Sequence, residues 1–280
     1  MNLADSLSEI VKNYRVIFFD AYGVVKNFTG LLDGVVPLLR QLNSEKIPFF
    51  ILTNDASRSP SLLSEYYIDK DGASLVPEEN IISSGLLAHE FIRAKVPQGQ
   101  IAYLGKSQSE FYIRTDVHQP IPIAEVVDPT KLVAFAMLDD EGFDWNHDIN
   151  KSLNILRHFN IPSIIANPDW TFPVGLSHLA MAIGGIGEIM ERICGKTFLR
   201  FGKPDAQVFT YAYSKAKQRI SDLQKSEILM IGDTLDTDIL GANKFGIHSA
   251  LVLTGNTMPE EYQRAIEQKG IQPDYVLKSL

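Results

Sequence analysis

The pattern of apolar and polar positions in the first part of the chain predicts a strand, a helix and a second strand. Val16–Phe19 and Phe49–Leu52 are short apolar runs with β-branched and aromatic residues, as in buried strands. Between them, Val35–Gln41 has the pattern of a helix, with Pro37 in its first turn. Such a unit predicts a parallel pair of strands joined by a right-handed crossover.

The same alternation returns in the last third of the chain. The predicted helices and apolar runs are Ala206–Lys217 (helix), Ile228–Ile231 (strand), Asp238–Phe245 (helix), Ala250–Leu253 (strand), Pro259–Gln268 (helix) and Tyr275–Leu277 (apolar run). Together with the first segment, these elements predict an α/β fold with a doubly wound, Rossmann-like parallel sheet.

The middle of the chain predicts its own set of elements. These are helices at Leu86–Arg93 and Asp148–Phe159 and strands at Ile101–Leu104, Val133–Met137 and Ser163–Ala166. They suffice for a second α/β domain. The expected organisation is a discontinuous core of residues 1–84 and 198–280, with residues 85–197 inserted between its two parts.

Composition narrows the class of protein. Of the 280 residues, 45% are hydrophobic and 21% are charged, as in soluble globular proteins, and the net charge of −8 disfavours binding to nucleic acid. The single cysteine, Cys194, excludes an internal disulfide, and neither a signal peptide nor an apolar run of membrane-spanning length is apparent. We therefore expect a cytoplasmic protein that binds neither membranes nor nucleic acid.

Polar residues that could support catalysis follow predicted strands. Four segments stand out: FFDAYG with Asp20, FFILTNDAS with Thr53 and Asn54, RFGKPD with Lys203, and LMIGDTLDTD with Asp233 and Asp238. The carboxyl ends of parallel strands form the ligand-binding edge of an open sheet, so these side chains are expected to converge. Lys203 follows a shorter apolar run, Phe198–Phe201, and is expected to reach the same edge from its loop.

Together these residues could transfer a phosphoryl group. A carboxylate such as Asp20 can attack phosphorus and form an aspartyl phosphate, which splits one difficult step into two. Mg²⁺ held by the hard oxygens of Asp20 and Asp233 would reduce the repulsion between this carboxylate and an anionic phosphate. Lys203 and the Thr53 hydroxyl could bind the remaining phosphate oxygens.

The order and spacing of these segments resemble the haloacid dehalogenase superfamily. GDTLDTDILGAN is similar to that family's last motif and ILTNDASRS to its second, while ANPDWTFP and FGKPDAQVF resemble the large-capped branch with 4-nitrophenylphosphatase-like and pyridoxal-phosphate phosphatases. The resemblance implies a phosphatase with an α/β cap. It also implies Mg²⁺ bound by Asp20, the backbone carbonyl of Tyr22 and Asp233, with Asp238 supporting the metal.

Tyr22 departs from the family pattern. In the phosphatases, an aspartate at this position protonates the leaving alcohol and then activates water. A phenol, with its pKa near 10, can donate a proton but is a poor base at neutral pH. We therefore expect weak turnover that favours good leaving groups, unless another acid replaces it. Asp55 and Asp169 are the candidates, although Asp55 could simply cap a helix and Asp169 could be a turn residue.

Two alternatives remain at this point. The stretch DAYG also resembles the start of the true haloacid dehalogenases, which attack carbon without a metal. Such a site has no need for Asp233, and Thr53 follows Asp20 by only 33 positions, too few for the dehalogenase's helical cap. By contrast, Lys203 follows Thr53 by 150 positions, which fits the large α/β cap. The second alternative is a catalytically weak protein that binds a phosphorylated metabolite.

The substrate is expected to be a small phosphorylated metabolite, such as a sugar phosphate, and the resemblance leaves nucleotides and pyridoxal phosphate open. Asn54, Asp55, Asn167 and Asp169 are the candidate substrate-binding residues, and a homodimer that pairs through the cap is also implied by the resemblance. The acidic run Asp139–Glu141 is expected to be a solvated loop, with a role facing the substrate as the alternative.

Overall fold

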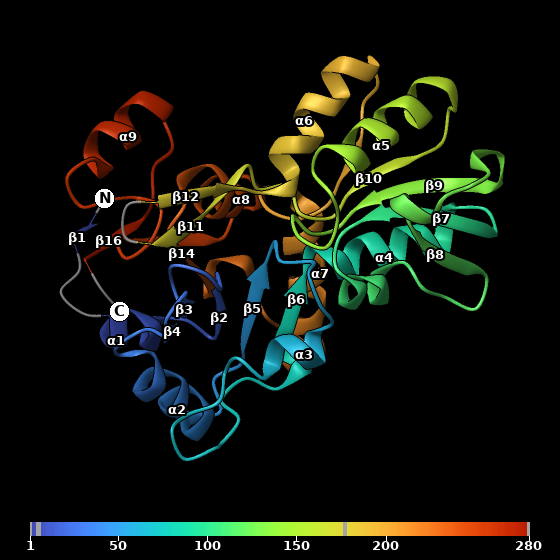
Figure 1. Cartoon of the computed structure of the whole chain (residues 1–280). Coiled ribbons are helices and arrows are strands. Elements are labelled where there is room, and N and C mark those ends of the chain that lie inside the picture. The colour runs from blue at the N-terminus through green and yellow to red at the C-terminus, as the bar shows by residue number, and fades with distance from the viewer. Residues whose placement is uncertain (1, 4–6, 176–177, 279–280) are drawn as a thin grey trace. The chain divides into compact units, whose positions relative to one another are not determined.

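The apolar runs of the sequence form two parallel sheets (Figure 1). The computed structural model describes all residues except 1, 4–6, 176–177 and 279–280. By their contacts, the residues group into two units: Met1–Thr53, Pro60–Ile82 and Lys203–Leu280 form the first, and Asn54–Ser59 and Ser83–Gly202 form the second. The segment Asn54–Ser59, which the sequence analysis assigned to the core, thus has its contacts in the second unit. Whether each unit is an independent domain stays a prediction.

The first unit is built on a sheet of seven described strands in the order β1-β16-β15-β14-β2-β5-β6. These strands are β1 (Asn2–Leu3), β2 (Val16–Phe19), β5 (Phe49–Thr53), β6 (Ile81–Ser83), β14 (Ile228–Gly232), β15 (His248–Val252) and β16 (Tyr275–Leu277). Strand β2 pairs in parallel with β14 on one side and β5 on the other. The order of the strands reverses at β2, which makes this the switch point of a doubly wound sheet, as predicted.

The central strands of this sheet are apolar because both of their faces are covered. All four residues of β2 are at most 1% exposed. Phe18 lies opposite Phe50 in the sheet, and their rings meet edge to face with 6.0 Å between centroids. A strand buried on both faces has no reason to alternate apolar and polar residues, which explains the continuous run in the sequence.

The helices of the first unit present one apolar stripe to its core. They are α1 (Leu7–Ile10), α2 (Val35–Glu45), α3 (Pro60–Ser64), α7 (Ala206–Arg219), α8 (Leu240–Phe245) and α9 (Tyr262–Lys269). In α2 the buried residues are Val35, Leu38, Leu39 and Leu42, a spacing of three and four that places them on one face. They join the buried cluster that includes Ile17 of β2. A short hairpin of β3 (Lys26–Asn27) and β4 (Gly30–Leu31) follows β2.

The second unit has a parallel sheet of five described strands in the order β13-β10-β9-β7-β8. Its elements are α4 (Ser84–Lys95), β7 (Gly99–Leu104), β8 (His118–Pro122), β9 (Leu132–Met137), α5 (His147–His158), β10 (Ser163–Ile165), β11 (Thr171–Gly175), β12 (His178–Met181), α6 (Ile183–Cys194) and β13 (Leu199–Arg200). Strands β11 and β12 form a separate antiparallel hairpin. Phe135, Leu156 and Ile186 contribute to the core between this sheet and its helices.

Three features of the second unit were not predicted. The strand β8, the hairpin β11–β12 and the helix α6 had no counterpart in the sequence analysis, and Cys194 is the last residue of α6. The apolar run Phe198–Phe201 contains β13, which pairs with β10 of the second sheet. No helix among the described residues is both long and apolar enough to cross a membrane.

Candidate active site

Asp20 follows β2 directly, at the carboxyl edge of the first unit's sheet. Its backbone N–H donates to the carbonyl of Ile231 at 2.8 Å, which ties the end of β2 to β14. The turn that follows contains Gly23, whose φ is +88°. A Cβ atom at Gly23 would lie 2.3 Å from Asp233 Oδ2, so only glycine lets the turn approach this carboxylate.

Three carboxylates meet at this edge. Asp20, Asp233 and Asp238 each offer one oxygen, and the three oxygens all lie within 4.8 Å of one another. Asp233 follows β14, and Asp238 lies in the π-helical turn Leu235–Ile239 that leads into α8. Asp233 and Asp238 are both 1% exposed and Asp20 is 9% exposed. The predicted convergence of these acids is therefore seen in the structure.

Lys203 lies among these acids. Its Nζ contacts Asp20 Oδ1 and is 2.8 Å from Asp238 Oδ1, and its side chain is only 3% exposed. Burial alone would lower the pKa of this lysine, but the charges of Asp20 and Asp238 outweigh burial and raise it above its ordinary value. Lys203 is therefore a fixed cation held against the candidate nucleophile.

The acids resist being ionised together. Burial, followed by the charges of Asp20 and Asp238, raises the pKa of Asp233. Burial and the charge of Asp20 also raise the pKa of Asp238 to about 7, although Lys203 acts in the opposite direction. The three carboxylates have one ammonium group among them, which contacts only Asp20 and Asp238, so a further positive charge would stabilise the ionised cluster.

This arrangement fits a divalent metal ion of the kind that haloacid dehalogenase-like sites hold. The donors are carboxylate oxygens, which suit hard cations such as Mg²⁺ and Ca²⁺. Each oxygen of Asp233 accepts one hydrogen bond, Oδ1 from the Thr234 hydroxyl at 2.9 Å and Oδ2 from the Asn256 N–H at 2.6 Å. A second lone pair on each oxygen stays available for a metal.

Tyr22 lies beside this cluster in the sequence, and its side chain is partly buried. Burial raises the pKa of its phenol above the ordinary value, so the hydroxyl stays protonated at neutral pH. The Lys26 Nζ lies 6.0 Å from the Tyr22 ring centroid and 4.2 Å from that of Tyr66. The chemistry open to Tyr22 is therefore proton donation.

The remaining predicted site residues fall into two places. Thr53 is the last residue of β5 and is 6% exposed, at the same sheet edge as Asp20. The other four residues, Asn54, Asp55, Asn167 and Asp169, all belong to the second unit.

Three of these four residues are linked by hydrogen bonds. Asn54 Nδ2 donates to Asp169 Oδ1 at 2.8 Å, and the Asp169 N–H donates to Asn167 Oδ1 at 3.0 Å. Asp55 Oδ1 accepts the N–H of Ser57 at 2.8 Å, which is the local turn that an aspartate commonly forms.

Sequence reasoning missed the segment 254–257, which follows β15 and holds Asp233 in place. Thr254 donates its hydroxyl to the carbonyl of Gly23 at 2.6 Å, and the N–H of Thr257 donates to the carbonyl of Asp233 at 3.1 Å. A Cβ atom at Gly255 would lie 1.9 Å from Asp233 Oδ2. Apart from the glycine that follows β15, nothing in the sequence marks this segment, because most of its contribution comes from backbone atoms.

The acidic run Asp139–Glu141 differs from expectation. It was predicted to be a solvated loop, but Asp139 is 6% exposed and Asp140 is partly buried, so only Glu141 is exposed as predicted. Lys106 Nζ lies 3.5 Å from Asp139 Oδ2 and 3.0 Å from Glu141 Oε2. The charge pattern alone could not show that this turn packs against the loop after β7.

Comparison with known proteins places the chain in a family. A family model for haloacid dehalogenase-like hydrolases matches residues 17–115, and a second, HAD-hydrolase-like model matches residues 200–280. A crystal structure from Cytophaga hutchinsonii, named as a possible sugar phosphatase of the HAD superfamily, is 43% identical with a TM-score of 0.94, and the match covers 100% of this chain and 98% of that one. The chain belongs to the haloacid dehalogenase superfamily.

Other members of the superfamily match over nearly the same length. The acid sugar phosphatase of Staphylococcus saprophyticus is 25% identical over 271 residues, which is 96% of each chain. The p-nitrophenyl phosphatase from Archaeoglobus fulgidus has a TM-score of 0.78 and 22% identity, covers 95% of this chain and 96% of that one, and shows a shared fold. The predicted membership of this superfamily and its α/β fold are confirmed, and the chain is a hydrolase of this superfamily.

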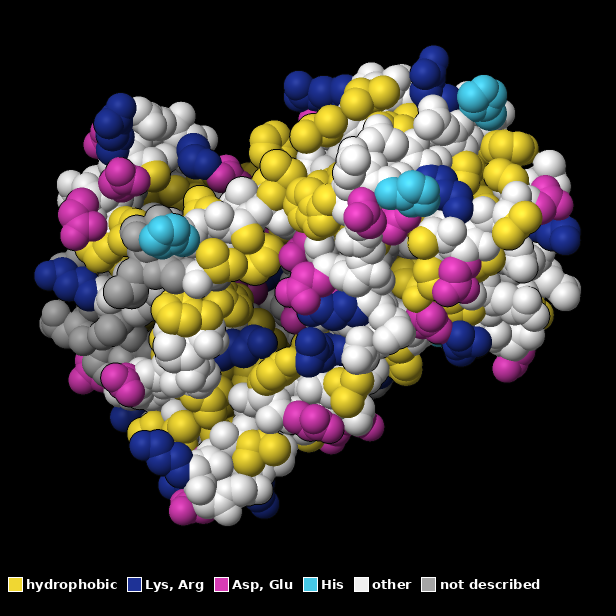
Figure 2. Space-filling model, viewed as in Figure 1, with side chains coloured by type: hydrophobic (Ala, Val, Ile, Leu, Met, Phe, Trp, Pro, Cys, Tyr) yellow, Lys and Arg dark blue, Asp and Glu magenta, His cyan; other side chains and the backbone are white. Residues whose placement is uncertain are grey.

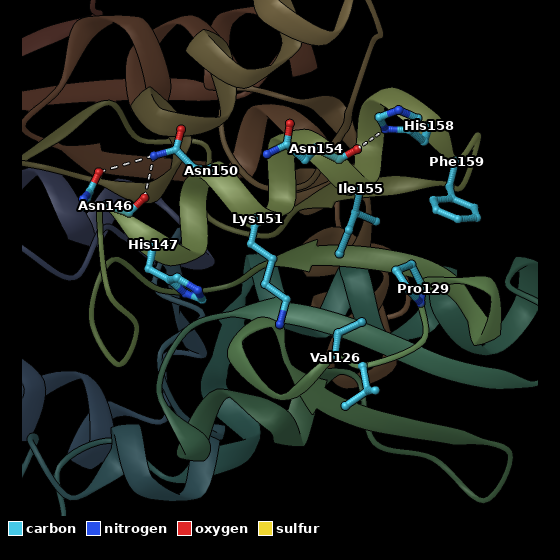
Figure 3. Close-up of a pocket in the computed structure, with 11 residues that line it drawn as sticks. Val126, Pro129, Asn146, His147, Asn150, Lys151, Asn154, Ile155, His158 and Phe159 are labelled. Carbon is cyan, nitrogen blue, oxygen red and sulfur yellow. Dashed lines mark hydrogen bonds between the residues drawn. The ribbon is translucent and has the colours of Figure 1, made fainter.

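A large cavity lies elsewhere, in the second unit (Figure 3). Its volume is about 630 Å³, and it is lined by Val126, Val127, Pro129, Asn146, His147, Asn150, Lys151, Asn154, Ile155, His158 and Phe159. Lys151 Nζ donates to the carbonyl of Ala124 at 2.8 Å. None of the predicted site residues lines this cavity, and it offers no carboxylate, so its size does not make it the reaction centre.

Proposed function

We propose that this hydrolase is a magnesium-dependent phosphatase of small phosphorylated metabolites that works through an aspartyl phosphate on Asp20. The phosphatase class is supported by the family and by the names of its relatives. One observation supports the mechanism above all others: Asp20, Asp233 and Asp238 bring their oxygens within 4.8 Å, with Lys203 between two of them. A site that attacks carbon without a metal has no use for this concentration of buried acids.

The chain offers three oxygen ligands for the metal, and water would complete its coordination. Asp20, Asp233 and the backbone carbonyl of Tyr22 would hold Mg²⁺, and Asp238 would support this shell. When bound, Mg²⁺ supplies positive charge that offsets the repulsion between the Asp20 carboxylate and the phosphate. Burial, together with the neighbouring acids, raises the pKa values of Asp233 and Asp238, and a bound cation would oppose both effects.

The reaction then uses side chains of the first unit. Asp20 attacks phosphorus, a bond forms between its carboxylate oxygen and phosphorus, and the bond from phosphorus to the alcohol oxygen breaks. Lys203 and Thr53 hold the phosphoryl oxygens as charge develops on them. Water then attacks the aspartyl phosphate, which releases inorganic phosphate and restores the Asp20 carboxylate.

Tyr22 limits the proton transfers. Its phenol, kept protonated by burial, can give a proton to the leaving alcohol. It is a poor base for the water that follows, because the phenolate left by that transfer regains a proton from solvent at neutral pH. Esters with good leaving groups need little help in the first step, so they are expected to be the better substrates.

Sugar phosphates are the substrate class we propose. The support comes from two relatives that are named as sugar phosphatases. We assign recognition of the non-phosphate part to Asn54, Asp55, Asn167 and Asp169, the polar residues of the second unit that follow strands β5 and β10.

The decisive experiment measures phosphate release from 4-nitrophenyl phosphate with Mg²⁺ and with EDTA. We expect Mg²⁺-dependent release that Asp20→Asn abolishes, with an exposed substitution, Asp116→Asn, as the control. Binding of inorganic phosphate without release would instead show a non-catalytic binder. Halide release from a 2-haloacid in EDTA would show the dehalogenase.

We also propose that the protein forms a homodimer through the second unit. Figure 2 shows hydrophobic side chains over the region where Figure 1 places α6 and the β11–β12 hairpin. The exposed residues there are Trp170, Val174, Leu179, Met181, Ile189 and Ile193. Exposed apolar groups of this kind mark interaction surfaces. Sedimentation of the wild type and of Leu179→Glu tests this, and a monomeric wild type would refute it.

A further inference from the structure

The sheet of the second unit also carries charged side chains at its carboxyl edge. Strands β7 and β9 are adjacent and parallel, with Leu104 opposite Met137. Lys106 comes two residues after β7, and Asp139 comes two residues after β9. In open parallel sheets this edge is where ligands bind, so these two residues occupy the position of a second site.

Asp139 has an unusual environment for a carboxylate. It is 6% exposed, and its Oδ1 accepts the Asp140 N–H at 2.9 Å. Its Oδ2 accepts no hydrogen bond from any residue that the structure describes. The nearest cation, Lys106 Nζ, lies 3.5 Å away, which is longer than a well-formed hydrogen bond. A buried acceptor without a hydrogen bond lowers the stability of the folded protein, and a ligand that donates a hydrogen bond to it would restore this free energy.

The loops around Asp139 are held close together by packing. Gly142 has a φ of +88°, and a Cβ atom there would lie 2.7 Å from the carbonyl oxygen of Gly105. The indole N–H of Trp145 donates to the carbonyl of Asp140 at 3.3 Å, and 45% of this side chain is exposed. An exposed aromatic ring is therefore fixed beside the acids.

The charges at this edge disfavour an anion and favour a neutral donor. Burial raises the pKa of Asp139, and the charge of Asp55 raises it further. Burial and Asp139 raise the pKa of Asp140 to about 6. A phosphate or carboxylate would add to this repulsion. Hydroxyl groups can instead donate to the carboxylates and accept from Lys106, while C–H groups of the same molecule pack on Trp145.

We propose that Lys106, Asp139 and Asp140 form a polyol-binding site that recognises adjacent hydroxyl groups, as carried by a sugar. The hydroxyl groups have two conceivable sources. They are either part of the phosphorylated substrate, in which case this inference rests on the proposed function, or they belong to a separate, uncharged sugar.

The first arm of the test is kinetic. Asp139→Asn and Lys106→Met are compared with the exposed controls Asp116→Asn and Lys95→Met, using glucose 6-phosphate and 4-nitrophenyl phosphate. If the substrate supplies the hydroxyl groups, kcat/KM for glucose 6-phosphate falls about ten-fold, mainly through KM, because hydrogen bonds to charged groups are lost. Turnover of 4-nitrophenyl phosphate, which has no hydroxyl groups, stays within about two-fold of the wild type by the same reasoning.

The second arm needs no turnover, so it is independent of the proposed function. The thermal midpoint of the wild type and of both variants is measured with added sorbitol, and the variants correct for the general effect of an osmolyte. If the site binds a separate sugar, the thermal midpoint of the wild type rises with sorbitol concentration and saturates, and that of the variants does not. The kinetics of the variants on glucose 6-phosphate then equal those of the wild type. If Asp139→Asn does not fold, the partly exposed Lys106→Met decides. Equal behaviour of wild type and variants in both arms overturns the inference, even if 4-nitrophenyl phosphate is hydrolysed.

Discussion

The two units carry charged groups at the same place in their sheets but arrange them differently. In the first unit, Asp20, Asp233 and Asp238 lie close together and Lys203 contacts two of them, Asp20 and Asp238, with all four residues nearly excluded from water. At the carboxyl edge of the second unit's sheet, the Lys106 side chain stays 24% exposed, and Asp139 is buried to a comparable degree whereas Asp140 is only partly buried. The first arrangement suits a metal ion and a charged reaction, whereas the second suits hydrogen bonding to a neutral molecule.

The largest effect is expected from removing the buried cation of the first unit. Lys203→Met leaves Asp20 and Asp238 without their ammonium partner, which costs about 3–5 kcal/mol of folding stability. It also lowers kcat on 4-nitrophenyl phosphate by about 10²–10³-fold, because a donor to the phosphoryl oxygens is lost. Lys106→Met, its counterpart, is expected to cost less than about 1 kcal/mol, because this lysine is itself partly exposed and its closer partner, Glu141, is solvated. Urea unfolding measures the loss of stability and steady-state kinetics the loss of kcat. Equal losses in the two variants would contradict the proposed difference between the two units.

A smaller but opposite effect is expected at Tyr22. Tyr22→Asp supplies a side chain that can donate a proton and then activate water, which raises kcat on unactivated alkyl phosphates by about 10²-fold. Hydrolysis of 4-nitrophenyl phosphate changes less, because its leaving group needs little protonation. Tyr22→Phe, the matched control, removes only the hydroxyl group. No change for alkyl phosphates in Tyr22→Asp would show that the tyrosine is not the limiting group.

Acids with raised pKa values in both units make stability depend on pH, and Asp238 of the first unit is the group that a substitution can single out. The pKa of Asp238 is raised to about 7 in the folded protein, so the folded state binds a proton more tightly than the unfolded state. In EDTA, this contribution to stability is full below about pH 4, the unfolded value, and is lost as the pH rises through 7.

Thermal unfolding checks this expectation. The midpoint in EDTA should fall between pH 5 and pH 8, and Mg²⁺ should remove the fall by replacing the proton. Asp238→Asn should make the fall in EDTA smaller, whereas Asp116→Asn should leave it as in the wild type. A fall of the same size in Asp238→Asn would assign the effect to another group.

The smallest effect is expected within the second unit. Asn54→Ala removes the donor to Asp169 and is expected to cost about 1 kcal/mol of stability. A double-mutant cycle with Asp169→Ala isolates this pair, with an expected coupling of about 0.5–1 kcal/mol. Additive effects would mean that the hydrogen bond contributes nothing measurable.

The positions of the three acids of the first unit could be predicted from the sequence, because each acid lies immediately after, or one turn beyond, a strand with a clear apolar pattern. Asp20 and Asp233 could be placed at one edge from strand order alone. Asp139 could not be recognised in the same way, because its burial depends on a turn at Gly142 that packs on Gly105. Charge runs are usually solvated, and nothing local marks this exception.

The second unit was harder to predict for a related reason. Helix α6 begins with Ile183–Gly187, where three glycines lie against other segments rather than marking a turn. A Cβ atom at Gly184 would lie 2.4 Å from the backbone of Pro168, and one at Gly187 would meet Ile165. Glycine lowers helix propensity, so close packing between distant segments overrides the local signal here.

The chain crosses between the two units four times, after Thr53, Ser59, Ile82 and Gly202. The first and last of these junctions adjoin Thr53 and Lys203, which we assign to holding the phosphoryl group. Anyone who replaces or shortens the long second-unit segment Ser83–Gly202 must therefore join the chain directly beside Lys203. A one-residue error at that junction would misplace a phosphate ligand, so successful chimaeras are expected only where the Gly202–Lys203 dipeptide is preserved.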